Sequence, residues 1–264
     1  MNLVEGKKAL IFGVANDHSI AWGIARALHE YGAEVALSYA ADQLERRVRP
    51  LGAQLGATFI EKCDVSDDVQ IGDLFSRAQE RIGRIDILVH AVAYAPREDL
   101  EGDFVDTSRS GFHAAMDVSV YSLVALTRAA LPLMTEGGSV LTLTYYGGEK
   151  VAPGYRVMGV AKAALESTVR YLAAELGRTG VRVNAISAGP VRTLAAAGVP
   201  GFRDMYPHFA ASTPLGRNID LDDLGNAAVW LSSEMSRNVT GQVIFVDSGH
   251  SILAAPSAAS PPPG

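Results

Sequence analysis

The stretch Gly138–Arg178, GSVLTLTYYGGEKVAPGYRVMGVAKAALESTVRYLAAELGR, decides the expected fold. Its first residues, Ser139–Thr144, predict an apolar strand, after which the chain crosses a glycine-containing loop and enters a long helix near Tyr155. Such a helix turns through about 700° between Tyr155 and Lys162, so both side chains should share one face, about 10 Å apart along the axis. An ammonium beside a phenol should lower the tyrosine pKa and allow proton exchange near neutral pH. The spacing alone equally fits an ordinary amphipathic helix with a solvated lysine.

The composition predicts a single globular domain. The 264 residues are 48% hydrophobic, which is enough for one large core. The formal net charge of −6 offers no electrostatic footprint for nucleic acid or for an anionic membrane surface. Cys63 is the only cysteine, which excludes an internal disulfide and fits a reducing, cytoplasmic compartment.

Neither end of the chain predicts a targeting or membrane segment. The apolar run near the N-terminus is too short for a signal peptide, and no stretch reaches the roughly 18 apolar residues of a membrane span. Residues 254–264 contain only Ala, Pro, Ser and Gly and predict a disordered tail. The folded domain should therefore span residues 1–253.

Short apolar runs alternate with helical patterns along the whole chain. The expected strands are Lys8–Phe12, Glu34–Tyr39, Ala57–Glu61, Ile85–His90, Ser139–Thr144, Val181–Ile186 and Gln242–Val246. Helices are expected up to His29, over Asp67–Ile82, Gly111–Met134 and Asp222–Ser232, and from Tyr155 to Arg178. This alternation predicts an α/β fold, a doubly wound, seven-stranded parallel sheet of the Rossmann type with helices on both faces.

The first strand leads directly into a glycine turn and a helix. Gly13 follows the strand, and Ser19, Ile20 and Gly23 lie in the segment that opens the helix. Strand, glycine turn and helix point backbone N–H groups and the helix dipole at a phosphate. The spacing is not G-x-G-x-x-G, so an ordinary turn that needs Gly13 for its backbone angles fits as well.

The end of the second strand bears on the cofactor. NAD-binding folds often carry an acidic residue there, and NADP-binding folds an arginine. The sequence has Ala40 and Ala41 at this point, while Arg46 and Arg47 come at least a turn later. The absence of a phosphate clamp favours NADH and leaves NADPH possible.

Other residues fall at the same expected edge of the sheet. Asp64 follows the third strand and could bind an adenine amino group or, as Ser66 could, cap the next helix. The small residues of Ala91–Pro96 allow a flat ring to approach the backbone. The mixed apolar and glycine- and proline-containing segment Ala195–Pro214 predicts a substrate-binding lid.

Together these residues resemble the short-chain dehydrogenase/reductase family, whose signature is Tyr-x-x-x-Lys. Six residues separate Tyr155 from Lys162 here, and Thr144-Tyr145 stands where that family carries a serine pair. His90-Ala91-Val92-Ala93 replaces its Asn-Asn-Ala-Gly, and Ser119 lies near the position of its catalytic Asn.

These departures match one branch, which the chain resembles from about Asn2 to Ile252. This branch is the enoyl-acyl-carrier-protein reductases of bacterial fatty-acid synthesis. The matching motifs are GVANDHSIAWGIA, CDV, Tyr145-x9-Tyr155-x6-Lys162 and ISAGPVRTLAA. The combination is specific, although no single motif is.

The resemblance implies the reaction and the roles of its residues. Hydride transfer to Cβ of an enoyl thioester places charge on the thioester oxygen, and Tyr155 would donate a hydrogen bond to that oxygen. Lys162 would hold the nicotinamide ribose, and Tyr145 would line the site, with aromatic packing as its alternative role. Ala95 would lie against the acyl substrate. The implied cofactor contacts are Gly13, Ser19, Ile20, Asp64, Val65, Val92, Lys162, Val191, Arg192, Thr193 and Leu194.

The resemblance also implies acyl carrier protein as the partner that carries the substrate, a homotetramer, and no metal. Two other functions remain open. A carbonyl or alcohol dehydrogenase would use Tyr155 with Thr144 as the helper hydroxyl, and a binding protein that senses NAD(P) would use no catalytic group.

Overall fold

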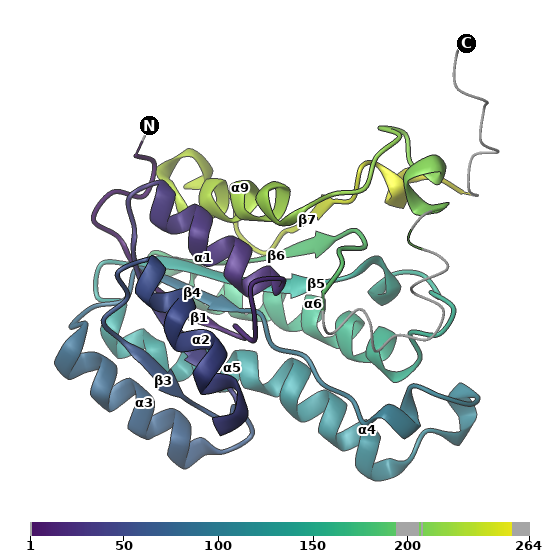
Figure 1. The fold of residues 1–264 in the computed structure, drawn as a ribbon, viewed down its shortest axis with the longest axis horizontal. Helices are drawn as coiled ribbons and strands as arrows, with labels where there is room; N and C mark the ends of the chain where they lie inside the picture. The colour runs from purple at the N-terminus through teal and green to yellow at the C-terminus, as the bar shows by residue number, and fades with distance from the viewer. Residues whose placement is uncertain (1, 194–205, 207, 255–264) are drawn as a thin grey trace.

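The computed structural model describes residues 2–193, 206 and 208–254. It contains a parallel seven-stranded sheet with strand order β3-β2-β1-β4-β5-β6-β7 (Figure 1). The strands are β1 Lys8–Phe12, β2 Glu34–Tyr39, β3 Ile60–Lys62, β4 Ile87–His90, β5 Gly138–Thr144, β6 Val181–Ala188 and β7 Val243–Val246. The predicted fold class is confirmed, and the predicted strands are shifted by a few residues at their ends, most at β3.

Helices cover both faces of the sheet because successive strand residues point to opposite sides. On β1, Ala9 and Ile11 join the core beneath α1, α2 and α9, whereas Leu10 and Phe12 join the core beneath α3, α5 and α6. In Figure 1, α1 and α9 lie side by side on one side of the sheet, and α3 and α5 lie on the other. The helices are α1 Ile20–Glu30, α2 Asp42–Gln54, α3 Asp68–Arg81, α4 Arg109–Met116, α5 Ser122–Ala130, α6 Val157–Leu176 and α9 Leu221–Ser232.

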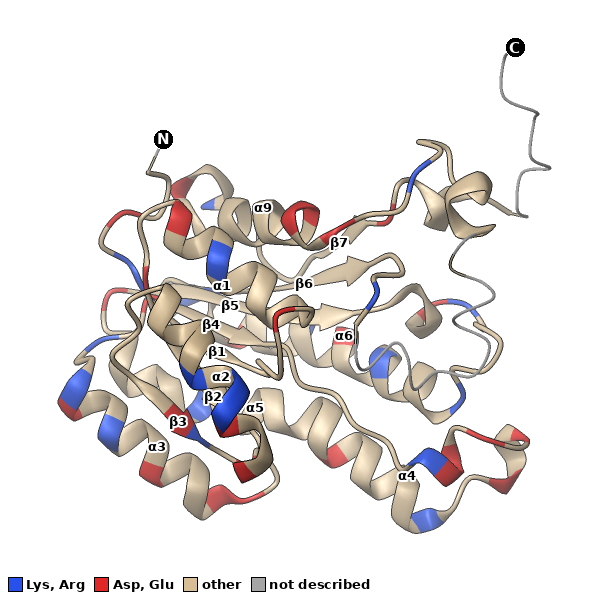
Figure 2. Cartoon of the chain, viewed as in Figure 1, with Lys and Arg blue, Asp and Glu red and all other residues tan. Residues whose placement is uncertain are grey.

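Charged side chains lie on the outer helices and loops, and the strands carry few of them (Figure 2). Helix α3 carries both acidic and basic residues, and its Arg77 and Arg81 both form ion pairs with Glu61 of β3. These ion pairs join the C-terminal part of α3 to β3, the edge strand of the sheet.

Short carboxylate caps fix where two helices begin. Asp67 caps α3 by accepting hydrogen bonds from the N–H groups of Val69 (2.9 Å) and Gln70 (3.2 Å). The prediction that Asp64 or Ser66 caps this helix is therefore wrong, because the N-cap position lies one residue after Ser66 and three residues after Asp64. Asp220 and Asp223 form a reciprocal capping box at the start of α9. Each such cap contributes about 1 kcal/mol.

The predicted helix Gly111–Met134 is interrupted in its middle. A π-helical turn, Asp117–Tyr121, joins α4 to α5. Single π turns inside α-helices frequently occur at functional sites. Contrary to the expectation that no segment qualifies, Arg109–Leu133 is long and apolar enough to cross a membrane by length and composition, but half of its most apolar window is buried inside the protein.

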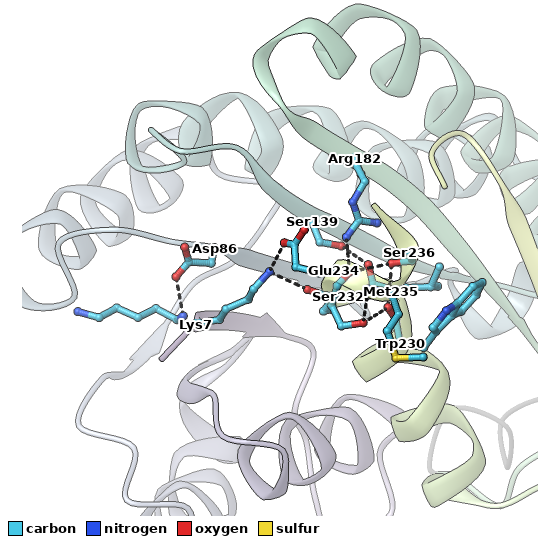
Figure 3. A network of polar contacts seen from close by, with 12 residues as sticks. Lys7, Asp86, Ser139, Arg182, Trp230, Ser232, Glu234, Met235 and Ser236 are labelled. Carbon is cyan, nitrogen blue, oxygen red and sulfur yellow. Dashed lines mark hydrogen bonds and ion pairs between the residues drawn. The ribbon is translucent and has the colours of Figure 1, made fainter. Parts of the chain in front are cut away.

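The amino end of the sheet carries a polar network that fastens the end of α9 to the strands (Figure 3). Lys7 Nζ donates to the carbonyl oxygen of Ser232 (3.2 Å) and to Glu234 (3.4 Å). Ser139 Oγ, in β5, donates to the carbonyl oxygen of Leu231 (3.0 Å). A cavity of about 520 Å³ opens beside this network.

Candidate active site

The predicted site residues gather at the opposite, carboxyl end of the strands. β1 and β4 are neighbours in the sheet, although two strands lie between them in the chain, so their connections leave in opposite directions. Such a topological switch point forms the ligand crevice of open α/β sheets. Gly13 follows β1 at this point, and Tyr145 follows β5 on the other side of β4.

Gly13 holds the loops after β1 and β4 against each other. Its φ is +99°, and a Cβ at this position would overlap the carbonyl group of Ala91. Only glycine fits both constraints. Gly13 therefore brings the start of the glycine turn next to the small residues that follow β4.

The first turn of α1 is open toward the loop. Ser19 is the N-cap residue, yet its hydroxyl donates to the carbonyl oxygen of Asn16 (2.6 Å) and does not cap the helix. Ile20 begins α1, which has no acidic residue in its first turn. An uncapped helix N-terminus without a nearby carboxylate on its first turn suits a phosphate. The residues here therefore fit a dinucleotide.

The remaining predicted cofactor residues lie around the same edge. Asp64 is exposed and accepts from Ser66 N (3.0 Å) and Oγ (2.7 Å), whereas Val65 is buried. Val92, after β4, packs on the apolar core on the α5 side of the sheet.

The segment after β6 completes this edge only in part. Val191 is buried, and Thr193 is half-buried. The Arg192 guanidinium lies 4.6 Å from the centre of the Tyr206 ring. Leu194 and most of the predicted lid Ala195–Pro214 lie outside the described residues.

Tyr145 and Tyr155 meet edge to face, with ring centres 4.8 Å apart and planes at 73°. Gly147 makes this possible, because a Cβ there would lie 2.6 Å from the Tyr155 ring and 3.1 Å from the Tyr145 ring. The predicted pair of site tyrosines is thus brought together by a glycine between them in the chain.

Tyr155 does not lie inside the helix, so the prediction of a shared helical face with Lys162 is wrong. α6 begins at Val157, and Arg156 separates it from Tyr155 with φ +47° and ψ −125°. A non-glycine residue in this region is strained, and such strain concentrates at functional sites. Arg156 Nε donates to the carbonyl oxygen of Leu100 (2.9 Å), which anchors the turn that presents Tyr155.

The predicted lowering of the Tyr155 pKa is also wrong. Burial raises the pKa of Tyr155 well above its usual value, and Tyr145 and Glu166 add to the increase. The phenol therefore stays protonated at neutral pH. Tyr155 is suited to donate a hydrogen bond, not to act as a phenolate base.

Lys162 is buried in α6 and is 5% exposed. Its Nζ donates to the carbonyl oxygen of Leu143 (2.7 Å), the one hydrogen bond that it makes within the described part of the chain. Burial lowers the pKa of Lys162 to about 8, and Glu166 opposes that effect. An ammonium has three donors, so Lys162 keeps donors for a ligand hydroxyl.

An apolar wall adjoins the tyrosines. Ala95 packs with Tyr155 and Phe112 against buried Val157 and Met158. The predicted substrate contact Ala95 and the predicted donor Tyr155 therefore belong to one cluster. A hydrocarbon chain beside the hydroxyl of Tyr155 would find apolar neighbours here.

Three residues near the site, Glu166, Ser119 and Arg156, were given no role in the site by the sequence analysis. Glu166 accepts a hydrogen bond from Thr144 Oγ1 at 2.6 Å, so the hydroxyl of Thr144 points to a carboxylate. Ser119, in the π turn, accepts from Tyr94 N (3.0 Å) and donates to Tyr94 O (3.2 Å). Arg156 carried no sequence signal, whereas the i, i+4 spacing of Lys162 and Glu166 was available.

No group of three or more His, Cys, Asp or Glu side chains in the described ranges could hold a metal ion.

A family model described as enoyl-(acyl carrier protein) reductase matches residues 13–251 of this chain. The NADH-dependent enoyl-[acyl-carrier-protein] reductase of Aquifex aeolicus is 52% identical over 254 residues, which cover 96% of this chain and 94% of that protein. Its crystal structure superposes with a TM-score of 0.93 and covers 96% of this chain and 100% of that one.

Two further solved structures contain a bound nucleotide. The enoyl-acyl carrier protein reductase of Bacillus cereus, in complex with NADP+ and indole naphthyridinone, has a TM-score of 0.95 at 48% identity and covers 97% of this chain and 100% of that one. The reductase of Anaplasma phagocytophilum, in complex with NAD, has a TM-score of 0.93 at 49% identity and covers 97% and 98%.

Proposed function

The chain belongs to the enoyl-(acyl carrier protein) reductase family, and we propose that Tyr155, Tyr145 and Lys162 carry out its reaction in this protein. The reaction is the NADH-dependent reduction of a trans-2-enoyl thioester, the last step of the fatty-acid elongation cycle. The observation that carries the assignment of residues is the contact of Tyr145 with Tyr155 beside Ala95, at the carboxyl end of the sheet.

Tyr155 supplies the hydrogen bond that the reaction needs. NADH, when bound, would supply the hydride for Cβ of the substrate, and negative charge would then develop on the thioester oxygen. Because its pKa is raised, Tyr155 keeps its proton and donates a hydrogen bond to that oxygen as the charge develops. A preorganised donor in a site without water contributes several kcal/mol to such a step.

Lys162 and Tyr145 orient the reacting groups. Lys162 Nζ, fixed by Leu143, offers its remaining donors to the ribose hydroxyls of the nicotinamide nucleotide. Tyr145 packs edge to face on Tyr155 and holds the plane of that ring. Its own pKa is raised by burial, so it also remains protonated.

Residues along the carboxyl edge, from the glycine turn to the end of β6, would hold the cofactor. The open N-terminus of α1 supports a pyrophosphate there, and the approach of Gly13 to Ala91 leaves backbone groups close to the ligand. The proposed cofactor contacts are Gly13, Ser19, Ile20, Asp64, Val65, Val92, Lys162, Val191, Arg192, Thr193 and Leu194. Ala95 contacts the acyl chain.

Acyl carrier protein carries the substrate, the protein acts in the cytoplasm, and four copies assemble. Tyr121, Val160 and Tyr171 are exposed on the π turn and α6, and exposed apolar side chains of this kind support an interface between copies.

The test of this function is NADH oxidation at about 340 nm, the absorption of the reduced nicotinamide, with crotonyl thioesters of coenzyme A and of acyl carrier protein. Turnover with NADH is expected, and NADPH run in parallel measures the cofactor preference. Turnover of ketones without turnover of enoyl thioesters would assign a carbonyl reductase instead. Binding of NADH without turnover of either substrate class would assign a cofactor-sensing protein.

A further inference from the structure

Glu166 is a buried carboxylate that the reaction described above does not use. It lies one turn after Lys162 in α6 and is 6% exposed. No basic side chain lies within ion-pair distance of it in the described ranges, and its hydrogen-bond donor is the hydroxyl of Thr144. Because a buried charge without partners is costly, a carboxylate kept at this place needs a reason.

The end of β5 holds two turns of α6 through consecutive residues. Leu143 accepts from Lys162 Nζ at 2.7 Å, and Thr144 donates to Glu166 Oε1 at 2.6 Å. Gly148 packs closely against Glu166 and against the backbone of Lys162. A Cβ at Gly148 would lie 2.9 Å from Glu166 Oε1 and 3.1 Å from the Lys162 carbonyl carbon. The strand end, the glycine loop and the helix therefore enclose the lysine and the carboxylate together.

We propose that Glu166, held in place by the Thr144 hydroxyl, is the buried counter-charge that favours the charged form of Lys162. This inference rests on the ribose-binding role of Lys162 proposed above. The alternative function as a carbonyl reductase would use the Thr144 hydroxyl as its helper group. In this chain that hydroxyl is directed to Glu166, so the strand end positions the lysine and not the substrate.

The neighbouring charged groups leave Glu166 as the group that opposes the effect of burial on Lys162. His90, in β4, is neutral because burial lowers its pKa to about 3. Glu149 and Arg170 also face Glu166, with opposite signs, while Tyr145 and Tyr155 remain protonated. Burial raises the pKa of Glu166, and the hydrogen bond from Thr144 lowers it again.

The sign of the expected effect follows from these directions. Lys162 loses its proton as the pH rises through a pKa of about 8, and NADH binding should weaken there. Glu166 raises that pKa. Removing its charge should therefore move the loss of NADH binding to lower pH.

The experiment measures the NADH dissociation constant and kcat/KM between about pH 6 and pH 10, the range in which a buried lysine titrates. Glu166→Gln keeps an oxygen for the Thr144 hydroxyl and removes the charge. The alkaline loss of NADH affinity should move to lower pH by about one unit. Glu175→Gln, on the exposed side of the same helix, is the matched control and should keep the profile of the wild type.

Thr144 provides the second arm. Thr144→Val leaves the carboxylate without its donor, which favours protonated Glu166, so the profile should shift in the same direction as for Glu166→Gln but by less. Thr144→Ser keeps the hydroxyl and should restore the wild-type profile. A purely structural role for the pair would lower the melting temperature of the variants and leave the pH profile in place.

The outcomes separate this inference from the proposed function. If the wild type binds NADH, Lys162→Ala lowers that affinity, and Glu166→Gln and Thr144→Val show the wild-type profile, Glu166 is not the counter-charge. If Lys162→Ala binds NADH as the wild type does, the ribose role of Lys162 is wrong, and the inference falls with it.

Discussion

The two ends of the same sheet carry charged side chains in different ways. At the amino end, charged groups line a cavity, and several of them are paired with one another or with backbone groups (Figure 3). Asp86 accepts from Lys8 N (2.8 Å) and from Arg84 Nε (3.1 Å), and Arg182 donates to the carbonyl oxygens of Val239 and Ser233. These contacts fasten loops to strands.

At the carboxyl end, the ionisable side chains of Lys162 and Glu166 are buried. Lys162 is paired with one carbonyl oxygen, and burial shifts its pKa and that of Tyr155 in the directions that favour their neutral forms. Groups shifted by burial and placed together are the mark of a functional site. The two ends therefore differ in how far their charged groups are paired with other groups of the protein.

The sharpest way to test this difference is to remove the donor at the carboxyl end. Tyr155→Phe should lower kcat on a crotonyl thioester by about 10²- to 10³-fold, because it removes the hydrogen bond to the developing enolate. The NADH dissociation constant, measured by calorimetry, should stay within about two-fold, since Tyr155 is not assigned to cofactor binding. Tyr171→Phe, on the exposed face of α6, is the control. Unchanged turnover of Tyr155→Phe would remove the phenol from the mechanism.

The second test measures whether the buried Lys162 at the carboxyl end lowers the free energy of unfolding. The folded protein releases the Lys162 proton near pH 8 and the unfolded chain near its ordinary pKa of 10.5. The unfolded chain therefore binds more protons between these values, and the stability that depends on Lys162 increases with pH across that window. Lys162→Met should raise the free energy of unfolding at pH 7 by up to about 3 kcal/mol over that of the wild type. Its urea midpoint should therefore be higher.

This advantage of Lys162→Met should decrease as the pH approaches 10.5. A stability difference between the two proteins that is the same at every pH would contradict the assignment of a strongly shifted pKa to this lysine.

The amino end should respond in the opposite sense. Asp86→Ala leaves the N–H of Lys8 without its acceptor and should lower the free energy of unfolding by about 1–2 kcal/mol. The same variant should keep the kcat of the wild type, since β1 and β4 still present their carboxyl ends unchanged. A large loss of kcat in a protein that remains folded would mean that the two ends are coupled.

The smallest effect is expected at the rim of the amino-end cavity. Lys7→Met removes an ion pair with Glu234, whose side chain is 82% exposed, and one hydrogen bond to Ser232 O. Because solvent screens such a pair, the melting temperature should fall by only a few degrees, equivalent to less than about 1 kcal/mol. A loss as large as that of Asp86→Ala would show that Lys7 holds α9 more firmly than its exposure indicates.

The sequence was sufficient for the features that local patterns control. Alternating strands and helices predicted the order of elements, and the approximate positions of the strands are confirmed because strands such as β1, β4 and β7 are short apolar runs. Gly13 was identified as a turn residue, and the structure adds that Ala91 leaves no room for a side chain there. The specific combination of motifs predicted the family that the comparisons show.

The sequence analysis was wrong about where the long helix begins, because it placed Tyr155 inside that helix. Tyr155 and Lys162 have a spacing that fits one helical face, but the positive φ of Arg156 places Tyr155 outside the helix. No local sequence pattern predicts a non-glycine residue with positive φ. Contacts with residues far away in the chain, such as the hydrogen bond from Arg156 to the Leu100 carbonyl, maintain this backbone conformation.

The sequence by itself therefore determined the strands, the helices and the identity of the chemical groups, because each depends on residues close together in the chain. Only the tertiary structure decided how those groups act. Burial, which no spacing reveals, keeps Tyr155 protonated and lowers the pKa of Lys162. The link between Thr144 and Glu166, 22 residues apart, likewise exists because α6 packs against the end of β5.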